Sequence, residues 1–201
     1  VEWLSLAAVC LLGAMSPGPS LAVVIASAVR GGAAAGFASA LAHGLGVGLY
    51  GLFTVAGLSA LLTGSPGLYL TVQLAGAGYL LWLAVGLLRS TGFTPATDEA
   101  AGPSHRSAAL DGFLVAFLNP KLAVFMLALF SQFLATDTSW TQRWIMVATV
   151  GTIDACWYAV IVALVSRPGV LSRLQASGAV IDRAFGVILV LLALTVLVSA
   201  L

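Results

Sequence analysis

The chain alternates long apolar stretches with short polar breaks. An α-helix needs about 20 apolar residues to cross the hydrocarbon core of a bilayer, and six stretches reach about that length. Their approximate limits are residues 3–29, 36–63, 67–88, 111–134, 143–166 and 181–200. The breaks between them are rich in glycine, proline, arginine and small polar residues, which end helices. The pattern predicts an all-α integral membrane protein with six transmembrane helices.

The breaks differ in length, and the longest divides the chain into two halves. The segment 90–110 is rich in threonine, proline, alanine and glycine, and it predicts a cytoplasmic linker within one transmembrane domain, 1–201. Residues 1–89 and 111–201 then carry three predicted spans each. Because three is odd, the second half must lie upside down relative to the first, which is the inverted-repeat plan of many secondary transporters. The short break at 64–67 predicts a tight antiparallel hairpin of the second and third spans.

Composition and charge narrow the class of protein. Of the 201 residues, 61% are hydrophobic and 7% are charged, whereas soluble domains carry about 25% charged residues. Most of the surface must therefore face lipid. The net charge is +1, and without a basic stripe to neutralise phosphates we expect no nucleic-acid partner. Cys10 and Cys156 lie in apolar stretches, so they predict no disulfide framework.

The basic residues predict an orientation in the membrane, because lysine and arginine gather in cytoplasmic loops. Arg143 lies on one side of the predicted spans and Lys121 lies within a span. Six arginines fall in or beside the first, third and fifth loops, on the other side: Arg30, Arg89, Arg106, Arg167, Arg173 and Arg183. The asymmetry predicts that both chain termini face away from the cytoplasm.

Two of the predicted spans are interrupted near their centres, one in each half. The first contains Ser16-Pro17-Gly18-Pro19 and the fourth contains Asn119-Pro120-Lys121. A proline deprives the carbonyl four residues earlier of its helical partner, here Gly13 and Ala116. Broken backbone survives at membrane depth only against protein or a water-filled cavity. An ordinary proline kink remains the alternative for each break, but the matched pair predicts a midplane substrate site.

Ionisable residues lie at membrane depth as well. Lys121 and Asp154 each lie about ten residues into a span, close to the bilayer centre. A charge there costs about 2.5–3.5 kcal/mol or more, so each needs a partner or water. The simplest hypothesis is that the two pair with each other or exchange partners with a substrate. The alternatives are snorkelling for Lys121 and a structural hydrogen-bond anchor for Asp154.

Two further side chains are candidates for the same site. His43 lies about a third of the way into the second span and can relay protons, because histidine changes charge near neutral pH. It can equally be a neutral histidine that is bonded to a neighbouring helix. Tyr158 follows Asp154 by about one turn and is a candidate cavity wall, although interfacial anchoring is the usual role of tyrosine.

Taken together, these motifs resemble the LysE/RhtB group of bacterial amino-acid and metabolite exporters. The matching pieces are "GAMSPGPSLAVVIASAVRGGAAAGFASALAHGLG", "VAGLSALL", "LAGAGYLLWLAVGLLR", "FLVAFLNPKLAVFMLALFSQF", "IDACWYAVIVAL" and "IDRAFGVILVLLAL". They occur in family order over nearly the whole chain. The resemblance implies a transporter without enzymatic activity or cofactor, which exports amino acids or related small zwitterions across the bacterial inner membrane by proton antiport.

Two positions depart from the family pattern. Ser131 stands where the family usually has proline, and Gly48 occupies a region where many relatives carry an acidic residue. If a proton-coupling group is missing from the second span, Asp154 becomes the main candidate for that duty, with His43 second. Substrate binding is expected at both breaks together with Asp154 and Tyr158.

Other functions stay open at this point. A metal-ion exporter is one alternative, although no cluster of metal-ligand residues at the usual spacing occurs. A transmembrane thiol-redox protein is another, and it would have to use Cys10 and Cys156. Gly44 and Gly48 form a GxxxG pattern that predicts close helix packing. That packing can be within one chain or between the chains of a homo-oligomer.

Overall fold

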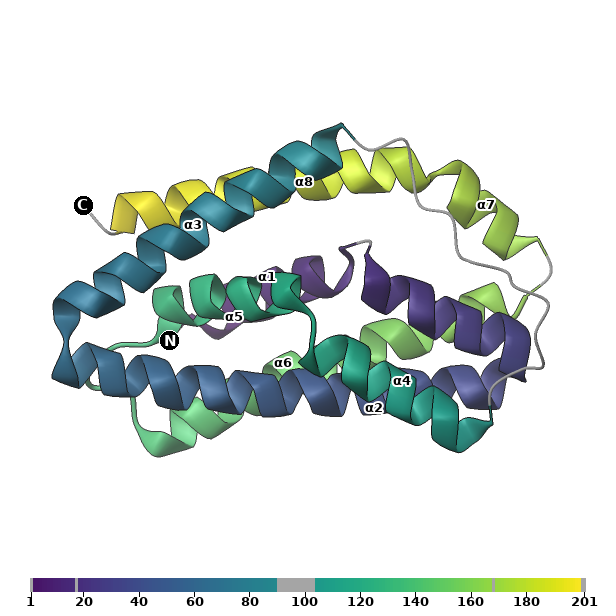
Figure 1. Ribbon diagram of the computed structural model, residues 1–201, viewed down its shortest axis with the longest axis horizontal. Helices are drawn as coiled ribbons and strands as arrows, with labels where there is room; N and C mark the ends of the chain where they lie inside the picture. Colours follow the sequence, from purple (N-terminus) through teal and green to yellow (C-terminus); the bar gives the residue numbers. More distant parts are fainter. Residues whose placement is uncertain (1, 17, 90–103, 168, 200–201) are drawn as a thin grey trace.

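The computed structural model describes residues 2–16, 18–89, 104–167 and 169–199, and all regular structure in these ranges is helical (Figure 1). The helices are α1 (Trp3–Ala14), α2 (Pro19–Gly64), α3 (Pro66–Leu88), α4 (His105–Phe117), α5 (Pro120–Phe133), α6 (Trp140–Val165), α7 (Val170–Ala176) and α8 (Gly178–Ser199). The expected all-α class is therefore confirmed. Most of the predicted linker lies outside the described residues. Its end, from His105 onward, already belongs to α4, because the Ser104 side chain caps that helix by accepting from the Ser107 N–H.

α2 is a helical hairpin rather than one straight helix. Its backbone turns at Gly32, where φ is +78° and ψ is 173°, a conformation that glycine adopts without steric cost. The two arms run back along each other (Figure 1). They pack closely, because a Cβ built on Gly36 would lie 2.6 Å from the Cβ of Ala28. The break expected here between the first and second spans is confirmed.

The interruptions in the first and fourth spans are also confirmed. α1 ends at Ala14 before α2 begins at Pro19, and α4 and α5 meet at a bend of 56°. The carbonyls of Gly13 and Ala116, which the prolines deprive of their helical partners, nevertheless accept hydrogen bonds. Gly13 O accepts the Ser16 N–H at 3.1 Å, and Ala116 O accepts the Asn119 N–H at 3.3 Å. At each of these helix ends the carbonyl oxygen accepts the N–H of the third residue after it. Such 3₁₀-type bonds are a common way of satisfying terminal carbonyls.

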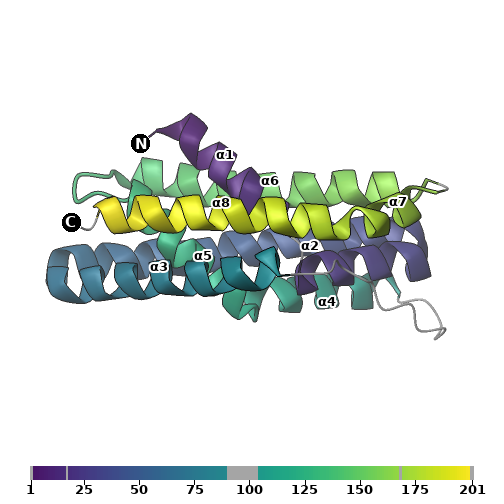
Figure 2. The same cartoon turned by 90° about the horizontal axis from the view of Figure 1, so that it is seen from above.

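The helices form an inner group and an outer pair. α2 packs against α4 and α6, and α1 packs against α6. α3 and α8 lie side by side on one flank of this group, where α3 also contacts α5 (Figures 1 and 2). The predicted tight hairpin of the second and third spans is wrong beyond its turn, because α3 leaves α2 and packs against α8 (Figure 1). A short loop keeps two consecutive helices adjacent at the turn, but it does not make them pack along their length. The packing partner depends on how well the surfaces of the two helices fit together.

Two of the described helices are long and apolar enough to cross a membrane, and a third can be counted if the bent pair α4–α5 is one span. The two are Pro19–Leu58, which includes the turn at Gly32, and Trp140–Val165. Trp3–Ala14 and Leu74–Gly86 are shorter apolar helices. The protein is therefore an all-α membrane protein in which several apolar helices are broken or folded back.

Glycines bring the second arm of α2 close to α6. A Cβ on Gly44 would lie 2.5 Å from the Cβ of Ala155 and 2.8 Å from the carbonyl oxygen of Gly151. A Cβ on Gly151 would in turn lie 3.2 Å from the Cα of Gly48. Small residues at such a crossing let helix backbones approach in a membrane. The predicted glycine packing surface is thus used inside the chain.

Candidate functional site

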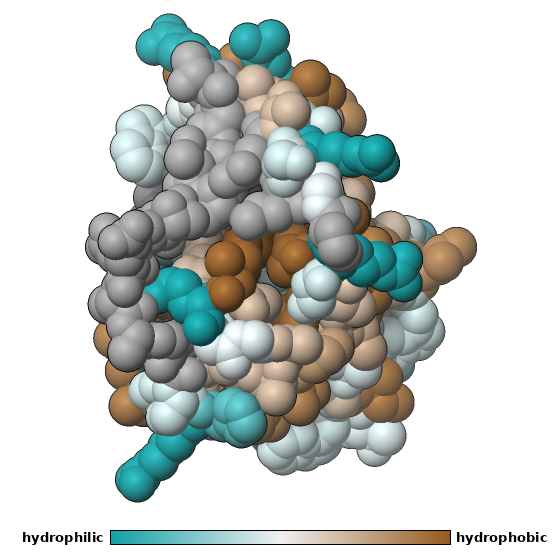
Figure 3. All heavy atoms as spheres, turned by 90° about the vertical axis from the view of Figure 1, so that its right-hand side faces the viewer, coloured by the Kyte–Doolittle hydropathy of each residue, from teal (hydrophilic) through white to brown (hydrophobic). Residues whose placement is uncertain are grey.

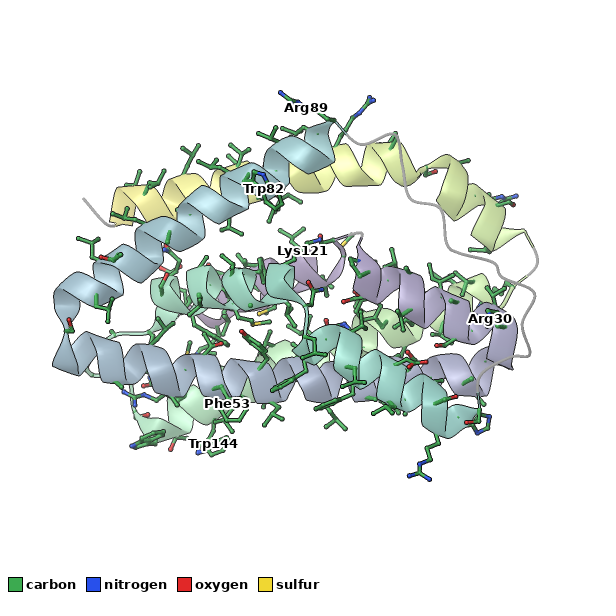
Figure 4. The ribbon with its side chains drawn as sticks, viewed as in Figure 1. Arg30, Phe53, Trp82, Arg89, Lys121 and Trp144 are labelled. Carbon is green, nitrogen blue, oxygen red and sulfur yellow. The ribbon has the colours of Figure 1, made fainter. Side chains whose placement is uncertain are left out.

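The two helix breaks lie against each other. Lys121, in the first turn of α5, donates from its Nζ to the hydroxyl oxygen of Ser16 in the first break. Asn119 donates from Nδ2 to Ser20 Oγ, in the first turn of α2, at 3.3 Å. These contacts join segments that are about one hundred residues apart in the sequence. Figure 4 shows Lys121 beside the gap between α1 and α2.

Local sequence explains why two helices begin at this place. Asn119 caps α5 by accepting the Lys121 backbone N–H at 3.0 Å on its Oδ1, and Pro120 takes the first helical position, where its missing N–H is not needed. α2 likewise begins with a proline, Pro19. The N-terminal end of a helix carries about half a positive charge. Two such ends and the Lys121 ammonium therefore give this part of the molecule a positive potential.

The buried carboxylate is paired with a histidine. Asp154, in the middle of α6, is 5% exposed, and His43, on the second arm of α2, is 1% exposed. His43 Nδ1 and Asp154 Oδ2 share a hydrogen bond of 2.6 Å; when the carboxylate is ionised it can only accept, so the imidazole donates. The hypothesis that Lys121 pairs with Asp154 stays a prediction, whereas the pair of Asp154 with His43 is seen directly. His43 holds the carboxylate, and Lys121 reaches Ser16.

Tyr158 completes the surroundings of the histidine. The rings of His43 and Tyr158 meet edge to face, with their centroids 4.7 Å apart and their planes at 69°. The Tyr158 side chain is 2% exposed and hydrogen-bonds Ser20. His43 Nε2 is also buried, but it has no hydrogen-bond partner among the described residues. One ring nitrogen is thus committed to Asp154 while the other is not.

A small cavity connects these groups. It has a volume of about 40 Å³, which is room for a few waters, because on the same measure one water needs about 10–15 Å³. Its polar lining comes from both breaks and from the histidine–carboxylate pair: Ser16, Ser20, His43, Asn119, Lys121, Asp154 and Tyr158. Its other lining residues are Cys10, Gly13, Ala14, Gly18, Val47, Leu122, Phe125, Met126 and Val150.

One aromatic ring narrows this cavity. A Cβ built on Gly13 would lie 2.4 Å from Phe125 Cζ, so the ring lies directly on the α1 backbone. Phe125 is 7% exposed and projects from α5, the helix that also carries Lys121. Glycine at position 13 is what permits this contact, because any larger residue would meet the ring.

The structure brings most of the predicted site residues together. Ser16, Gly18, His43, Asn119, Lys121, Asp154 and Tyr158 all line the cavity. Pro19 is exposed and lines a separate outer pocket with Asn119, Pro17 lies outside the described residues, and Pro120 opens α5 with a side chain outside the described set. Their roles stay predictions.

Sequence reasoning missed several cavity residues. Ser20 directly follows the first break, so its position alone could have identified it. Phe125, Met126, Val47 and Val150 carry no polar signal in an apolar helix, and only packing shows which side they face. Cys10, predicted to be a buried small hydrophobe, is 3% exposed but also lines the cavity.

Comparison with known proteins agrees with this architecture. The chain matches the LysE type translocator family over residues 11–200. It is 26% identical to the threonine efflux protein of Escherichia coli (strain K12) over 171 residues, which are 83% of this chain and 82% of that protein. It is 32% identical to the leucine efflux protein of Enterobacter sp. (strain 638) over 142 residues, 69% of this chain and 67% of that protein.

A relative without an assigned activity is similar over slightly more of the chain. An uncharacterized membrane protein of Vibrio cholerae is 25% identical over 181 residues, 86% of this chain and 88% of that protein. No solved structure matches the chain. The family match spans both helix breaks, the histidine–carboxylate pair and the outer helices. The chain therefore belongs to the LysE type translocator family and is a bacterial membrane protein.

Proposed function

We propose that this protein is a secondary active exporter of amino acids or similar small zwitterions, driven by proton antiport across the bacterial inner membrane. The single observation that carries the proposal is the cavity where the two broken helices meet, because it holds Lys121 and Asp154 at membrane depth. The efflux of threonine and leucine named for two relatives supports the same substrate class.

A zwitterion matches the charges around the cavity. Its carboxylate would bind near Lys121 and the N-terminal ends of α2 and α5, which together provide positive potential. Its ammonium would bind Asp154, the only carboxylate among the described residues that line the cavity. The side chain of the amino acid would then lie against Phe125, Met126 and Val150.

An inverted repeat of two three-span halves, residues 1–89 and 111–201, accounts for the packing. In such a repeat the equivalent spans of the two halves meet around one pseudo-two-fold axis. The broken spans touch through Lys121 and Ser16, the arms that follow them cross at Gly44 and Gly151, and α3 packs against α8. All three equivalent pairs are thus in contact, which supports the proposed six-span plan.

The two breaks also share a hydrogen-bond pattern. Met15, which ends the α1 segment, donates to the carbonyl oxygens of Leu11 and Gly13. Leu118, which ends the α4 segment, donates to those of Leu114 and Ala116. The next residue along the chain also donates to one of these carbonyls: the Ser16 N–H bonds Gly13 O, and the Asn119 N–H bonds Ala116 O. The end of α6 shows the same pattern at Ser166 and Arg167, so the pattern describes how these helices end and does not by itself relate the two halves.

The orientation proposed from the arginines places both chain termini on the non-cytoplasmic side. Arg30 lies at the end of the molecule where α2 turns (Figure 4). Seen from that side, hydrophilic residues project around the rim of the end face (Figure 3). We propose that this end faces the cytoplasm, because basic residues are retained there during insertion.

We propose that the structure represents a closed state of an alternating-access cycle, because hydrogen bonds join the two breaks beside the cavity. Rocking of one half against the other would open the site to one side at a time. The contacts that must loosen are those between the breaks, Lys121 with Ser16 and Asn119 with Ser20. A hydrogen bond of this kind contributes about 1 kcal/mol net, which a bound substrate can replace.

Transport in proteoliposomes tests the proposal. Vesicles that contain the protein are loaded with labelled L-threonine or L-leucine, and a pH gradient is imposed. The expected result is gradient-dependent efflux that Asp154→Asn and Lys121→Met abolish. The matched control is Asp111→Asn, which changes an exposed carboxylate in the middle of α4 and should transport as the native protein does. Absence of efflux of either amino acid from the native protein would refute these two substrates.

The structure does not favour the alternative functions. Among the described residues no group of three or more His, Cys, Asp and Glu side chains is placed to hold a metal ion. Cys10 lines the cavity, whereas Cys156 is exposed and lines an apolar groove with Leu4, Trp157 and Val160. The two thiols therefore belong to different pockets of the molecule.

A further inference from the structure

We propose that the substrate ammonium and a protonated His43 compete for the carboxylate of Asp154, so that each amino acid leaves in exchange for one proton carried by His43. This inference rests on the proposed export function and deepens it. It names His43 as the proton carrier and Asp154 as the group that both cations share.

The first argument is the placement of the pair. His43 comes from α2 and Asp154 from α6, 111 residues later, and the 2.6 Å contact between them borders the cavity. A buried carboxylate without a partner costs several kcal/mol, so one cation or strong donor must accompany Asp154 at every stage of transport. In this closed structure His43 fills that role. A substrate ammonium that enters the cavity would fill it instead.

The second argument is the unsatisfied nitrogen of His43. Nδ1 is bonded to Asp154, but the buried Nε2 has no hydrogen-bond partner among the described residues. A neutral imidazole has one nitrogen that bears a proton and one that lacks it. A histidine with a purely structural role would be expected to have both ring nitrogens satisfied, because unpaired buried polar atoms are costly. The uncommitted nitrogen leaves the ring free to gain and lose a proton.

The third argument is the charge of the other groups that face His43. Asp154 and Tyr158 face it from α6, Cys10 lines the cavity from α1, and Lys121 lines it from α5. α4 also packs on α2, but its ionisable residues are all exposed: His105, Arg106 and Asp111. Among the described residues that line the cavity, Asp154 is thus the one carboxylate, and it cannot neutralise two neighbouring cations. Binding of the ammonium therefore favours loss of the proton from His43.

The resulting cycle balances protons and charge. On the cytoplasmic side the ammonium of the amino acid binds Asp154, and the imidazole releases one proton to the cytoplasm. On the other side the amino acid leaves, and the imidazole takes up one proton from outside and donates again to Asp154. One proton enters for each zwitterion that leaves, so one positive charge moves inward per turnover. Export should therefore respond to membrane potential as well as to the pH gradient.

The decisive variant is His43→Gln, because glutamine can still donate a hydrogen bond to Asp154 but cannot take up a proton. The matched control is His105→Gln, which removes the chain's other histidine from an exposed position. Both are reconstituted and compared in two assays. The first is exchange of labelled for unlabelled L-leucine or L-threonine without a gradient, and the second is uphill transport driven by a pH gradient.

We expect His43→Gln to keep exchange and to lose uphill transport down to the level of protein-free vesicles, while His105→Gln matches the native protein in both assays. Uphill transport by His43→Gln would overturn the proposal. If the native protein neither exchanges nor exports either amino acid, the proposed export of these substrates fails instead. That result differs from uphill transport by His43→Gln, which would overturn only the role of His43.

A second measurement covers the case in which His43→Gln does not fold. The native protein in weakly buffered detergent solution is mixed with L-leucine or L-threonine near neutral pH, and proton release is followed with a pH dye while calorimetry reports binding. We expect binding to release protons, up to about one proton per bound amino acid. Binding without proton release at any pH between 5 and 8 would overturn the proposal.

Discussion

The inner contact between α2 and α6 and the outer contact between α3 and α8 are both made by apolar helices, yet they are built differently. At the inner contact, glycines bring the backbones together around the buried pair His43 and Asp154. At the outer contact a glycine also brings the helices close, because a Cβ on Gly186 would lie 3.1 Å from the carbonyl oxygen of Ala84. The described buried residues of α3 and α8 are, however, all non-polar: Gly76, Ala77, Leu80, Ala84, Gly186, Leu189 and Ala193. Buried charge at membrane depth is costly and is retained for function. The difference therefore separates the contact that holds the candidate site from one whose described buried residues are all non-polar.

The largest expected effect comes from filling the inner contact. Gly44→Leu would place its side chain against Ala155 and the Gly151 carbonyl, where a Cβ alone already comes within 2.5 Å. Overpacking of this kind costs about 1–3 kcal/mol or more. We expect loss of folded protein, measured as the thermal midpoint and the monodisperse fraction in detergent. Gly78→Leu on α3 is the control, because a Cβ there meets nothing within 4 Å. Equal losses in both variants would show that the loss does not come from the close approach at Gly44.

A cavity in the outer contact should affect stability but not transport. Leu189 on α8 is 1% exposed, and we expect Leu189→Ala to lower the free energy of unfolding by about 2 kcal/mol. That value is the low end for buried leucine changes, because lipid, unlike water, solvates the exposed leucine well. Transport per folded molecule should stay at the native level in proteoliposomes. A selective loss of transport would assign the outer pair a direct role in the cycle.

A smaller substitution, inside the cavity, should affect transport but not stability. Gly13→Ala would push its Cβ against the ring of Phe125, whereas a Cβ on Gly18 would lie 3.4 Å from Lys121 Nζ. We expect Gly13→Ala to slow efflux severalfold with little change in thermal midpoint, because it hinders movement of the ring at the site. Gly18→Ala should have a weaker effect. If the two variants are equally active, Phe125 does not need to move.

The smallest expected effect is at the start of α5. Asn119→Ala removes both the cap on Lys121 N–H and the bond to Ser20, and we expect a loss of about 1 kcal/mol. Asn119→Asp keeps a capping oxygen but cannot donate to Ser20. Chemical denaturation should place it between the native protein and Asn119→Ala. A larger loss for Asn119→Asp than for Asn119→Ala would indicate that the nearby charges, rather than the cap, dominate.

Much of the architecture was predictable because lipid imposes simple rules. Apolar length located the helices, and the prolines and glycines at Ser16–Pro19 and Asn119–Lys121 located the two breaks, since these residues cannot continue a helix without penalty. Gly32 ended the first arm of α2 for a similar reason. The partner of α3 was not predictable, because that helix is apolar on every side and its sequence does not favour one neighbour.

The residues of the site were more predictable than the contacts between them. Lys121, Asp154 and His43 stood out because ionisable residues are rare at membrane depth. The sequence therefore determined the membrane class, the broken spans and the polar residues available for transport. Only the tertiary structure decided that Asp154 pairs with His43, that Lys121 reaches Ser16, and that Phe125 lies on Gly13. Such pairings depend on how helices cross and rotate, and that is set by contacts between residues that are far apart in the chain.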